Sequence, residues 1–176
     1  DLPLHVEGVA SNGAASVVLE LTQASQTFRF TNVTEVPVPS LLRDFSAPVV
    51  LEYDYTDAQL LHLFRHDSDP VNRWEAGQRL AMERLLKLTG AVAAGEPLVL
   101  DETFIAAQRA LLADDTLDPA FRELALILPS ETIIAERMAQ VDPQAIHAAR
   151  QFMRTTIAAA LKPELLALYH ANQTPG

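Results

Sequence analysis

The chain has 176 residues, a formal net charge of −10, and 49% hydrophobic against 20% charged side chains. This composition is typical of a folded soluble protein with one ordinary domain or two small ones. The acidic balance disfavours nucleic acid and anionic membranes as partners, and no apolar run approaches the roughly 20 residues that span a bilayer. Because the chain has no cysteine, which excludes disulfides and thiolate metal sites, and no signal peptide, we expect a cytoplasmic location.

The first 55 residues alternate between apolar and polar side chains, as a half-buried strand does. Four segments show this alternation: residues 4–9, 15–21, 26–30 and 49–53. Ser11-Asn12-Gly13 favours a turn, since Asn and Gly accept a positive φ at low cost. Pro37, Pro39 and Pro48 remove backbone donors, so the segment that carries them cannot be a central strand. The pattern predicts one short antiparallel sheet with a single apolar face.

From Thr56 onward the apolar period changes to 3.6 residues, which indicates helices. Thr56 and Gln59 fit a capping box, and three Asp-Pro pairs are helix-start signals, as are Asp101 and Ser130. The pairs are Asp69-Pro70, Asp118-Pro119 and Asp142-Pro143. The expected helices are 57–66, 70–90, 102–113, 119–128, 131–140 and 143–171, the last kinked or split at Pro163.

Six helices joined by short loops predict antiparallel hairpins stacked side by side, as in an α-solenoid. The predicted class is therefore α+β: a short antiparallel β-sheet, part of a β-sandwich, followed by antiparallel helical hairpins of α-solenoid type. The sheet domain is expected over residues 1–55 and the helical domain over residues 56–176.

Two histidines offer the sharpest candidate for metal chemistry. His62 and His66 stand four residues apart on a predicted helix, the spacing with which two imidazoles bind zinc. The metallopeptidase motif needs Glu directly after the first His, and Leu63 stands there. The sequence therefore favours two polar residues on an exposed helix face.

Three aspartates form a second candidate, a binding loop for a hard cation around Asp114, Asp115 and Asp118. The place of the bidentate Glu in such a loop is taken by Ala125, so these carboxylates are predicted to cap helices. The sequence also contains no cysteine nucleophile, no G-x-S-x-G elbow and no glycine-rich phosphate loop. We therefore assign no catalytic, no cofactor-binding and no metal-binding residue.

Two runs of sequence are unusual: residues 21–28 (L-T-Q-A-S-Q-T-F) and residues 38–49 (V-P-S-L-L-R-D-F-S-A-P-V). With residues 73–76, 124–129 and 165–169, they resemble the bacterial aminopeptidase N family, zinc-dependent alanyl aminopeptidases of the gluzincin clan. The resemblance implies that residues 1–55 are the later part of a small β-sandwich domain and residues 56–176 the beginning of a superhelical domain. The family's H-E-x-x-H zinc motif and its G-A-M-E-N anchor are both missing from the sequence.

The resemblance implies a parent enzyme that removes N-terminal amino acids from peptides with Zn²⁺, while this chain is a non-catalytic structural fragment, inactive alone and without a cofactor. Its partners would be the catalytic domain and the remaining C-terminal helices of the same parent chain, and the parent's peptide substrates. The first residue is Asp1 and not Met, so we expect a piece of something longer, with a processed mature chain as the alternative. Two other hypotheses stay open: a stand-alone helical-repeat module that binds proteins, and a small metalloprotein that uses His62 and His66.

Overall fold

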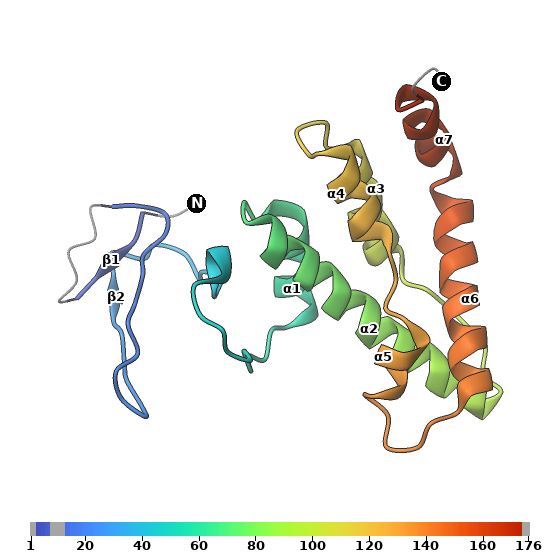
Figure 1. Ribbon diagram of the computed structural model, residues 1–176, viewed down its shortest axis with the longest axis horizontal. Coiled ribbons are helices and arrows are strands. Elements are labelled where there is room, and N and C mark those ends of the chain that lie inside the picture. Colours follow the sequence, from blue (N-terminus) through green and yellow to red (C-terminus); the bar gives the residue numbers. More distant parts are fainter. Residues whose placement is uncertain (1–2, 8–12, 174–176) are drawn as a thin grey trace. The chain divides into compact units, whose positions relative to one another are not determined.

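The computed structural model describes residues 3–7 and 13–173, in two compact units, Asp1–Pro39 and Ser40–Gly176. The first unit contains a two-stranded antiparallel sheet of β1 (His5–Val6) and β2 (Phe30–Thr31), in which His5 faces Thr31 and Val6 faces Phe30 (Figure 1). The ladder is extended by the Glu7 amide, which donates to the Arg29 carbonyl at 2.9 Å. Val6 is buried.

The predicted short antiparallel sheet is confirmed, but it is smaller than the alternation suggested. Residues 15–21 and 49–53 form no strand, and of residues 26–30 only Phe30 does. Gly8, Val9 and most of the predicted turn at residues 11–13 lie outside the described residues. A period of two makes a strand only where a neighbouring strand supplies hydrogen bonds and a covered face. Val18 and Val50, which are 79% and 91% exposed, have no such face among the described residues.

Residues 40–173 of the second unit contain a short 3₁₀ helix, η1 (Arg43–Phe45), followed by seven α-helices. These are α1 (Asp57–His66), α2 (Pro70–Ala94), α3 (Glu102–Ala113), α4 (Pro119–Leu126), α5 (Glu131–Ala135), α6 (Pro143–Ala160) and α7 (Lys162–Ala171). The predicted order of a short antiparallel sheet followed by helical hairpins is thus confirmed. None of the described helices is both long and apolar enough to cross a membrane.

Every helix start that the sequence predicted is capped as expected. The Thr56 hydroxyl accepts from the Gln59 amide at 3.3 Å, and the Gln59 side chain accepts from the Thr56 amide at 2.9 Å. A side-chain oxygen also accepts from a first-turn amide at five further starts. Those caps are Asp69, Asp101, Asp118, Ser130 and Asp142. Helix starts are predictable because their signals lie within one turn of chain.

Helix ends depart from the prediction. Helix α2 continues past residue 90 to Ala94, because Gly95 takes the left-handed conformation (φ 68) that closes a helix. Helix α4 stops at Leu126, since Pro129 disfavours helical backbone in the residue before it. Helix α5 is a single turn, although residues 131–140 were expected to be helical.

The predicted break at Pro163 is real and divides α6 from α7 at Leu161. Pro163 has no amide to donate to the carbonyl four residues before it, and the last carbonyls of any helix have no partner within that helix. Arg109 of α3 donates to one of them, the Ala160 oxygen, at 3.1 Å, and also to the Glu164 carboxylate of α7 at 2.8 Å. The break is therefore held by a side chain from a third helix.

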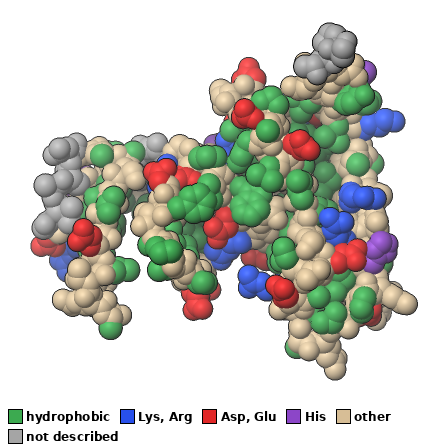
Figure 2. Space-filling view, in the orientation of Figure 1, with side chains coloured by type: hydrophobic (Ala, Val, Ile, Leu, Met, Phe, Trp, Pro, Cys, Tyr) green, Lys and Arg blue, Asp and Glu red, His purple; other side chains and the backbone are tan. Residues whose placement is uncertain are grey.

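The core of the second unit is built around α2, which packs beside α1 and against α4, α5 and α6. In Figure 1, α6 lies against the C-terminal end of α2. The largest fully buried apolar side chains come from α1, α2, α3, α5 and α6 and from Leu161. They are Phe64, Phe104, Leu60, Leu80, Leu85, Leu111, Ile134, Ile146, Met153 and Leu161. On the helical face seen in Figure 2, acidic and basic side chains are interspersed among hydrophobic ones, so this view shows no continuous basic surface.

Candidate functional site

The histidine pair lies on α1 as the sequence predicted, with both side chains exposed and the ring centroids 5.1 Å apart. Partial desolvation lowers the pKa of His66 below its usual value, and His62, Arg65 and Arg73 lower it further. Residues 3–7 and 13–173 contain no group of three or more His, Asp or Glu side chains placed to hold a metal ion. Two imidazoles leave zinc two ligands short of its tetrahedral set.

The aspartates near the histidines have other roles. Asp69 caps α2 through the Val71 and Asn72 amides, at 2.9 and 3.0 Å. Asp67 is buried, and one of its oxygens accepts from the Asp69 amide at 2.9 Å. Burial by itself would raise the pKa of Asp69, but the hydrogen-bonding amides outweigh burial and hold that pKa below its usual value. These carboxylates are committed to the loop between α1 and α2.

Asp114 and Asp118 are likewise engaged in contacts within the fold. Asp118 caps α4 through the Ala120 amide at 2.7 Å, which confirms the capping prediction for that residue. Asp114 accepts from the buried Arg73 at 3.2 Å, and Arg73 also donates to the Phe64 carbonyl at 2.8 Å. Arg73 therefore ties the last turn of α1 to the loop after α3.

An extensive polar network of the second unit joins the chain before α1 to the α1–α2 loop. We name residues 40–55 the strap. Arg43 of the strap donates to the Asp67 carboxylate at 2.8 Å and to the Ser68 hydroxyl at 2.9 Å. The Asp67 side chain is 1% exposed, so its charge is neutralised by Arg43 away from water. The backbone amide of Asp44 adds a hydrogen bond of 2.9 Å to Asp69.

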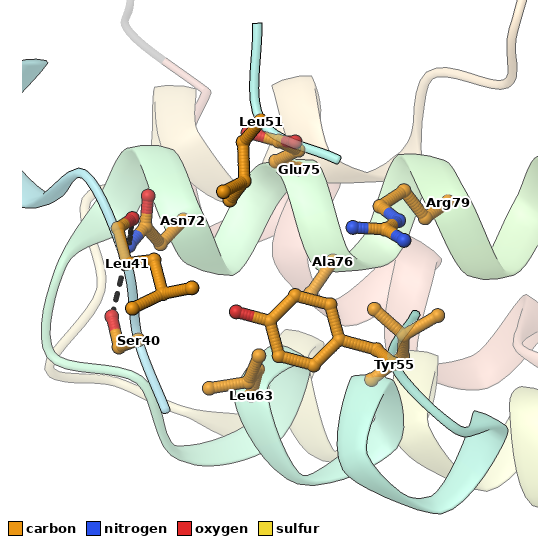
Figure 3. Close-up of a pocket in the computed structure, with 10 residues that line it drawn as sticks. Ser40, Leu41, Leu51, Tyr55, Leu63, Asn72, Glu75, Ala76 and Arg79 are labelled. Carbon is orange, nitrogen blue, oxygen red and sulfur yellow. Dashed lines mark hydrogen bonds between the residues drawn. The ribbon is translucent and has the colours of Figure 1, made fainter. Parts of the chain in front are cut away.

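Helix α2 holds the same segment through an amide side chain. Asn72 donates to the Ser40 hydroxyl and to the Leu41 carbonyl, both at 2.8 Å (Figure 3). The Arg43 guanidinium also reaches the Ser40 hydroxyl, at 3.1 Å. At the other end of the strap, Arg79 of α2 donates to the Tyr53 carbonyl at 2.7 Å. The strap is therefore fastened to the first helical hairpin at both ends.

The strap contains backbone of unusual conformation. Leu42, Asp44 and Phe45 have φ values of 55°, 55° and 52°. Residues other than glycine rarely adopt this left-handed region of the backbone. Phe45 gains little from this conformation by burial, because its side chain is 77% exposed. The hydrogen bonds of Arg43 and Asp44 hold the segment in this shape.

A small pocket lies between the strap and the two helices, and Leu41, Leu51, Leu63 and Ala76 form its apolar walls (Figure 3). Its cavity volume of about 20 Å³ is room for about one water molecule. Burial, assisted by Tyr53, raises the pKa of the Tyr55 phenol on its rim to about 12. The phenol is therefore neutral at physiological pH. A pocket of this size and lining is a gap between packed side chains.

A second polar cluster clamps the starts of two helices. Arg84 of α2 donates to both oxygens of Asp57, at 2.6 and 3.2 Å, and to both oxygens of Asp101, at 2.7 and 3.1 Å. Its guanidinium also lies 5.1 Å from the centroid of the Phe104 ring. Burial opposes ionisation of Asp101, but hydrogen bonds from Arg84, Thr103 and the Phe104 amide outweigh it and lower the pKa of Asp101 to about 2.

This shift predicts a pH dependence of stability. An unfolded Asp has a pKa of about 3.9, so the stability that Asp101 contributes is present above that pH and is lost as pH falls toward about 2. Asp101→Asn keeps a capping oxygen but cannot ionise. We expect the urea midpoint of the natural chain to fall more steeply between about pH 5 and pH 2.5 than that of Asp101→Asn. Parallel curves for the two proteins would contradict the role of this carboxylate.

Two family models match the chain. A model described as a domain of unknown function (DUF3458_C) with ARM repeats matches residues 57–176. A model described as a domain of unknown function (DUF3458) with an Ig-like fold matches residues 1–54. ARM repeats are stacked helical hairpins, in agreement with the solenoid-type packing predicted for the helices.

Several curated proteins are similar to the chain. Aminopeptidase N of Escherichia coli (strain K12) is 44% identical over 171 residues, which cover 97% of this chain and 19% of that protein. Aminopeptidase N of Caulobacter vibrioides is 42% identical over 160 residues, 90% of this chain and 18% of that protein. Aminopeptidase N of Haemophilus influenzae is 38% identical over 178 residues, 96% of this chain and 20% of that protein. The chain therefore spans about a fifth of the length of the curated relatives it matches.

A solved structure of an aminopeptidase is also similar to the chain. It is the crystal structure of Legionella pneumophila aminopeptidase A in complex with aspartic acid. Its sequence is 32% identical to this chain, and the two structures superpose with a TM-score of 0.66. The similarity covers 82% of this chain and 17% of that chain.

Proposed function

Because the chain belongs to the DUF3458_C family of ARM-repeat domains and is homologous to a region of aminopeptidase N, as its sequence predicted, we propose that it is a non-catalytic structural region of a zinc-dependent aminopeptidase. The parent enzyme would remove N-terminal amino acids from peptides. The observation that carries this proposal is the 44% identity to Aminopeptidase N of Escherichia coli across 97% of this chain.

The zinc and its ligands belong, in this proposal, to a separate part of the parent polypeptide. The sequence lacks the H-E-x-x-H motif that would supply them, and it lacks the G-A-M-E-N anchor for a substrate's amino group. The aspartates near His62 and His66 cap helices or pair with Arg43 and Arg73. Nothing in this donor set resembles a three-ligand catalytic site with an open position.

The proposed role follows from the two kinds of structure in the chain. Residues 1–55 would be the last part of an Ig-like domain that adjoins the catalytic domain, and residues 56–176 would begin the helical array. This division is supported by the family models, which match residues 1–54 and 57–176. Stacked hairpins form extended curved walls, which suits a chamber that admits only peptides and unfolded ends.

Activity measurements on the purified chain test the proposal. We expect no hydrolysis of an aminoacyl chromogenic substrate by residues 1–176, with or without added Zn²⁺, although the protein is helical and unfolds cooperatively. The full-length parent should hydrolyse the same substrate and lose activity to a chelator. If the isolated chain turned over substrate in a way that depends on zinc and on His62, its non-catalytic role would be overturned. If the parent had no aminopeptidase activity, the proposed activity of the parent would be overturned.

A further inference from the structure

Two descriptions of the chain divide it at different places. The family models place the change from Ig-like to helical sequence between residues 54 and 57. The compact helical unit, in contrast, begins at Ser40. The strap, residues 40–55, is thus grouped with the sheet by sequence similarity and with the helices by its contacts.

We propose that the strap is a conformational latch over the α1–α2 hairpin, held closed by Arg43 and the Asp44 amide and biased toward release by its own left-handed backbone. The proposal concerns the second unit alone and does not depend on the proposed aminopeptidase function.

The closing contacts are few and specific. Arg43 donates to the buried Asp67 carboxylate at 2.8 Å and to Ser68 at 2.9 Å, and Asn72 donates twice to the start of the strap. When the strap leaves, the Asp67 charge loses its cation. Its second oxygen has no hydrogen-bond partner among the described residues, even when the strap is closed. Because the Asp67 side chain is 1% exposed, removing Arg43 would leave its carboxylate buried without a cation in the closed state, so loss of Arg43 should shift the latch strongly toward the open state.

The opening bias comes from three left-handed residues, Leu42, Asp44 and Phe45. Each such residue is disfavoured by about tenfold relative to right-handed backbone, with Asp the mildest case. Phe45 is 77% exposed, so packing does not repay its conformation. The polar anchors favour the closed strap and the left-handed backbone opposes it, so the free-energy difference between closed and open states is smaller than the anchors alone would give, which is the property of a latch.

Opening has a defined consequence for the hairpin. The closed strap lays Leu41, Leu51 and Tyr55 against Leu60 and Leu63 of α1 around the small pocket. Leu60 and Leu63 are 1% and 6% exposed in the closed state. An open strap uncovers this side of α1, so opening should be visible as faster amide exchange in both the strap and α1.

Position 44 gives the sharpest test, because the Asp44 side chain is exposed and only its backbone amide bonds to Asp69. Asp44→Gly and Asp44→Ala remove the same carboxylate and differ only in backbone preference. At ordinary backbone positions the alanine variant is the more protected of the two, since glycine is more flexible when unfolded. At a left-handed position the order reverses, and we expect the strap of Asp44→Ala to exchange about fivefold faster than that of Asp44→Gly.

The experiment is hydrogen–deuterium exchange of the full 176-residue chain, read on peptides from the strap, α1 and α6. Arg43→Ala should speed exchange in the strap and α1 by about tenfold or more and leave α6 unchanged. The control is Arg65→Ala on α1, because Arg65 is exposed and makes no hydrogen bond or ion pair with any described residue. It should leave all three peptides unchanged.

Three results would overturn the latch. The strap of the natural chain could exchange at the rate of an unstructured peptide, in which case it is not docked. Asp44→Gly could exchange faster than Asp44→Ala, in which case the backbone there is not left-handed. If Arg43→Ala sped exchange equally in the strap, α1 and α6, Arg43 would support the whole fold and not a local closure.

Discussion

Replacing Gly77 with alanine should lower the free energy of unfolding by about 2 kcal/mol, although alanine is the better helix former. Gly77 lies in α2 where that helix meets α1. A Cβ atom at this position would lie 2.6 Å from Cε2 and 2.7 Å from Cδ2 of Phe64. The Phe64 ring is fully buried, so it can move only by displacing its neighbours in the core.

Gly90 on the same helix provides the matched control. A Cβ atom there would meet nothing within 4 Å, and the residue is exposed. Gly90→Ala should therefore raise the free energy of unfolding by about 1 kcal/mol through helix propensity alone. Urea unfolding followed by circular dichroism measures both variants. If the two substitutions stabilise the chain equally, α1 and α2 do not approach each other at Gly77 as closely as described.

Replacing Arg84 with methionine should lower the free energy of unfolding by about 2 kcal/mol. Methionine keeps most of the side-chain volume, so the loss reports the four hydrogen bonds to Asp57 and Asp101. The two carboxylates are 48% and 42% exposed and can recover water when the guanidinium is gone. For this reason the expected loss is below that of a fully buried pair.

Lysine at position 84 separates charge from geometry. Arg84→Lys keeps the cation but cannot hold two carboxylates in the forked geometry of a guanidinium, so it should recover less than half of the loss. Arg154→Met on α6 is the control, because Arg154 is exposed and forms no ion pair or hydrogen bond within the described part of the chain. Its unfolding free energy should stay within about 0.5 kcal/mol of the natural chain. An Arg84→Met protein as stable as the Arg154→Met protein would show that the clamp contributes nothing.

Sequence-based prediction succeeded for features whose interacting groups lie close together in the chain. Thr56 and the three Asp-Pro pairs marked helix starts correctly, because a cap and the amide it accepts from lie within three residues. The strands were less predictable, since residues 15–21 alternate correctly but pair with no neighbour among the described residues. The sequence likewise did not show that α5 ends after a single turn, at Ala135, beside α6.

The polar networks could not be predicted from spacing. The run at residues 38–49 is unusual, but the sequence does not show that Arg43 within it pairs with Asp67, 24 positions later. The same holds for Arg84, whose partner Asp57 lies 27 positions earlier. Conversely, His62 and His66 have a clear spacing and contact no further potential metal ligand in the described part of the chain. Periodicity reports which face of an element a residue occupies and carries no information on partners in other elements.

The break between α6 and α7 has a consequence for the shape of a helical array. A proline break removes helix hydrogen bonds between the two segments, so the angle between them depends on contacts made by other parts of the structure. Here Arg109 donates hydrogen bonds to the Ala160 carbonyl on one side of the break and to Glu164 on the other. These bonds fix the angle between α6 and α7. The local curvature of the array at Leu161 is thereby set in part from α3, and a neutral residue at position 109 would free the angle between α6 and α7 to change.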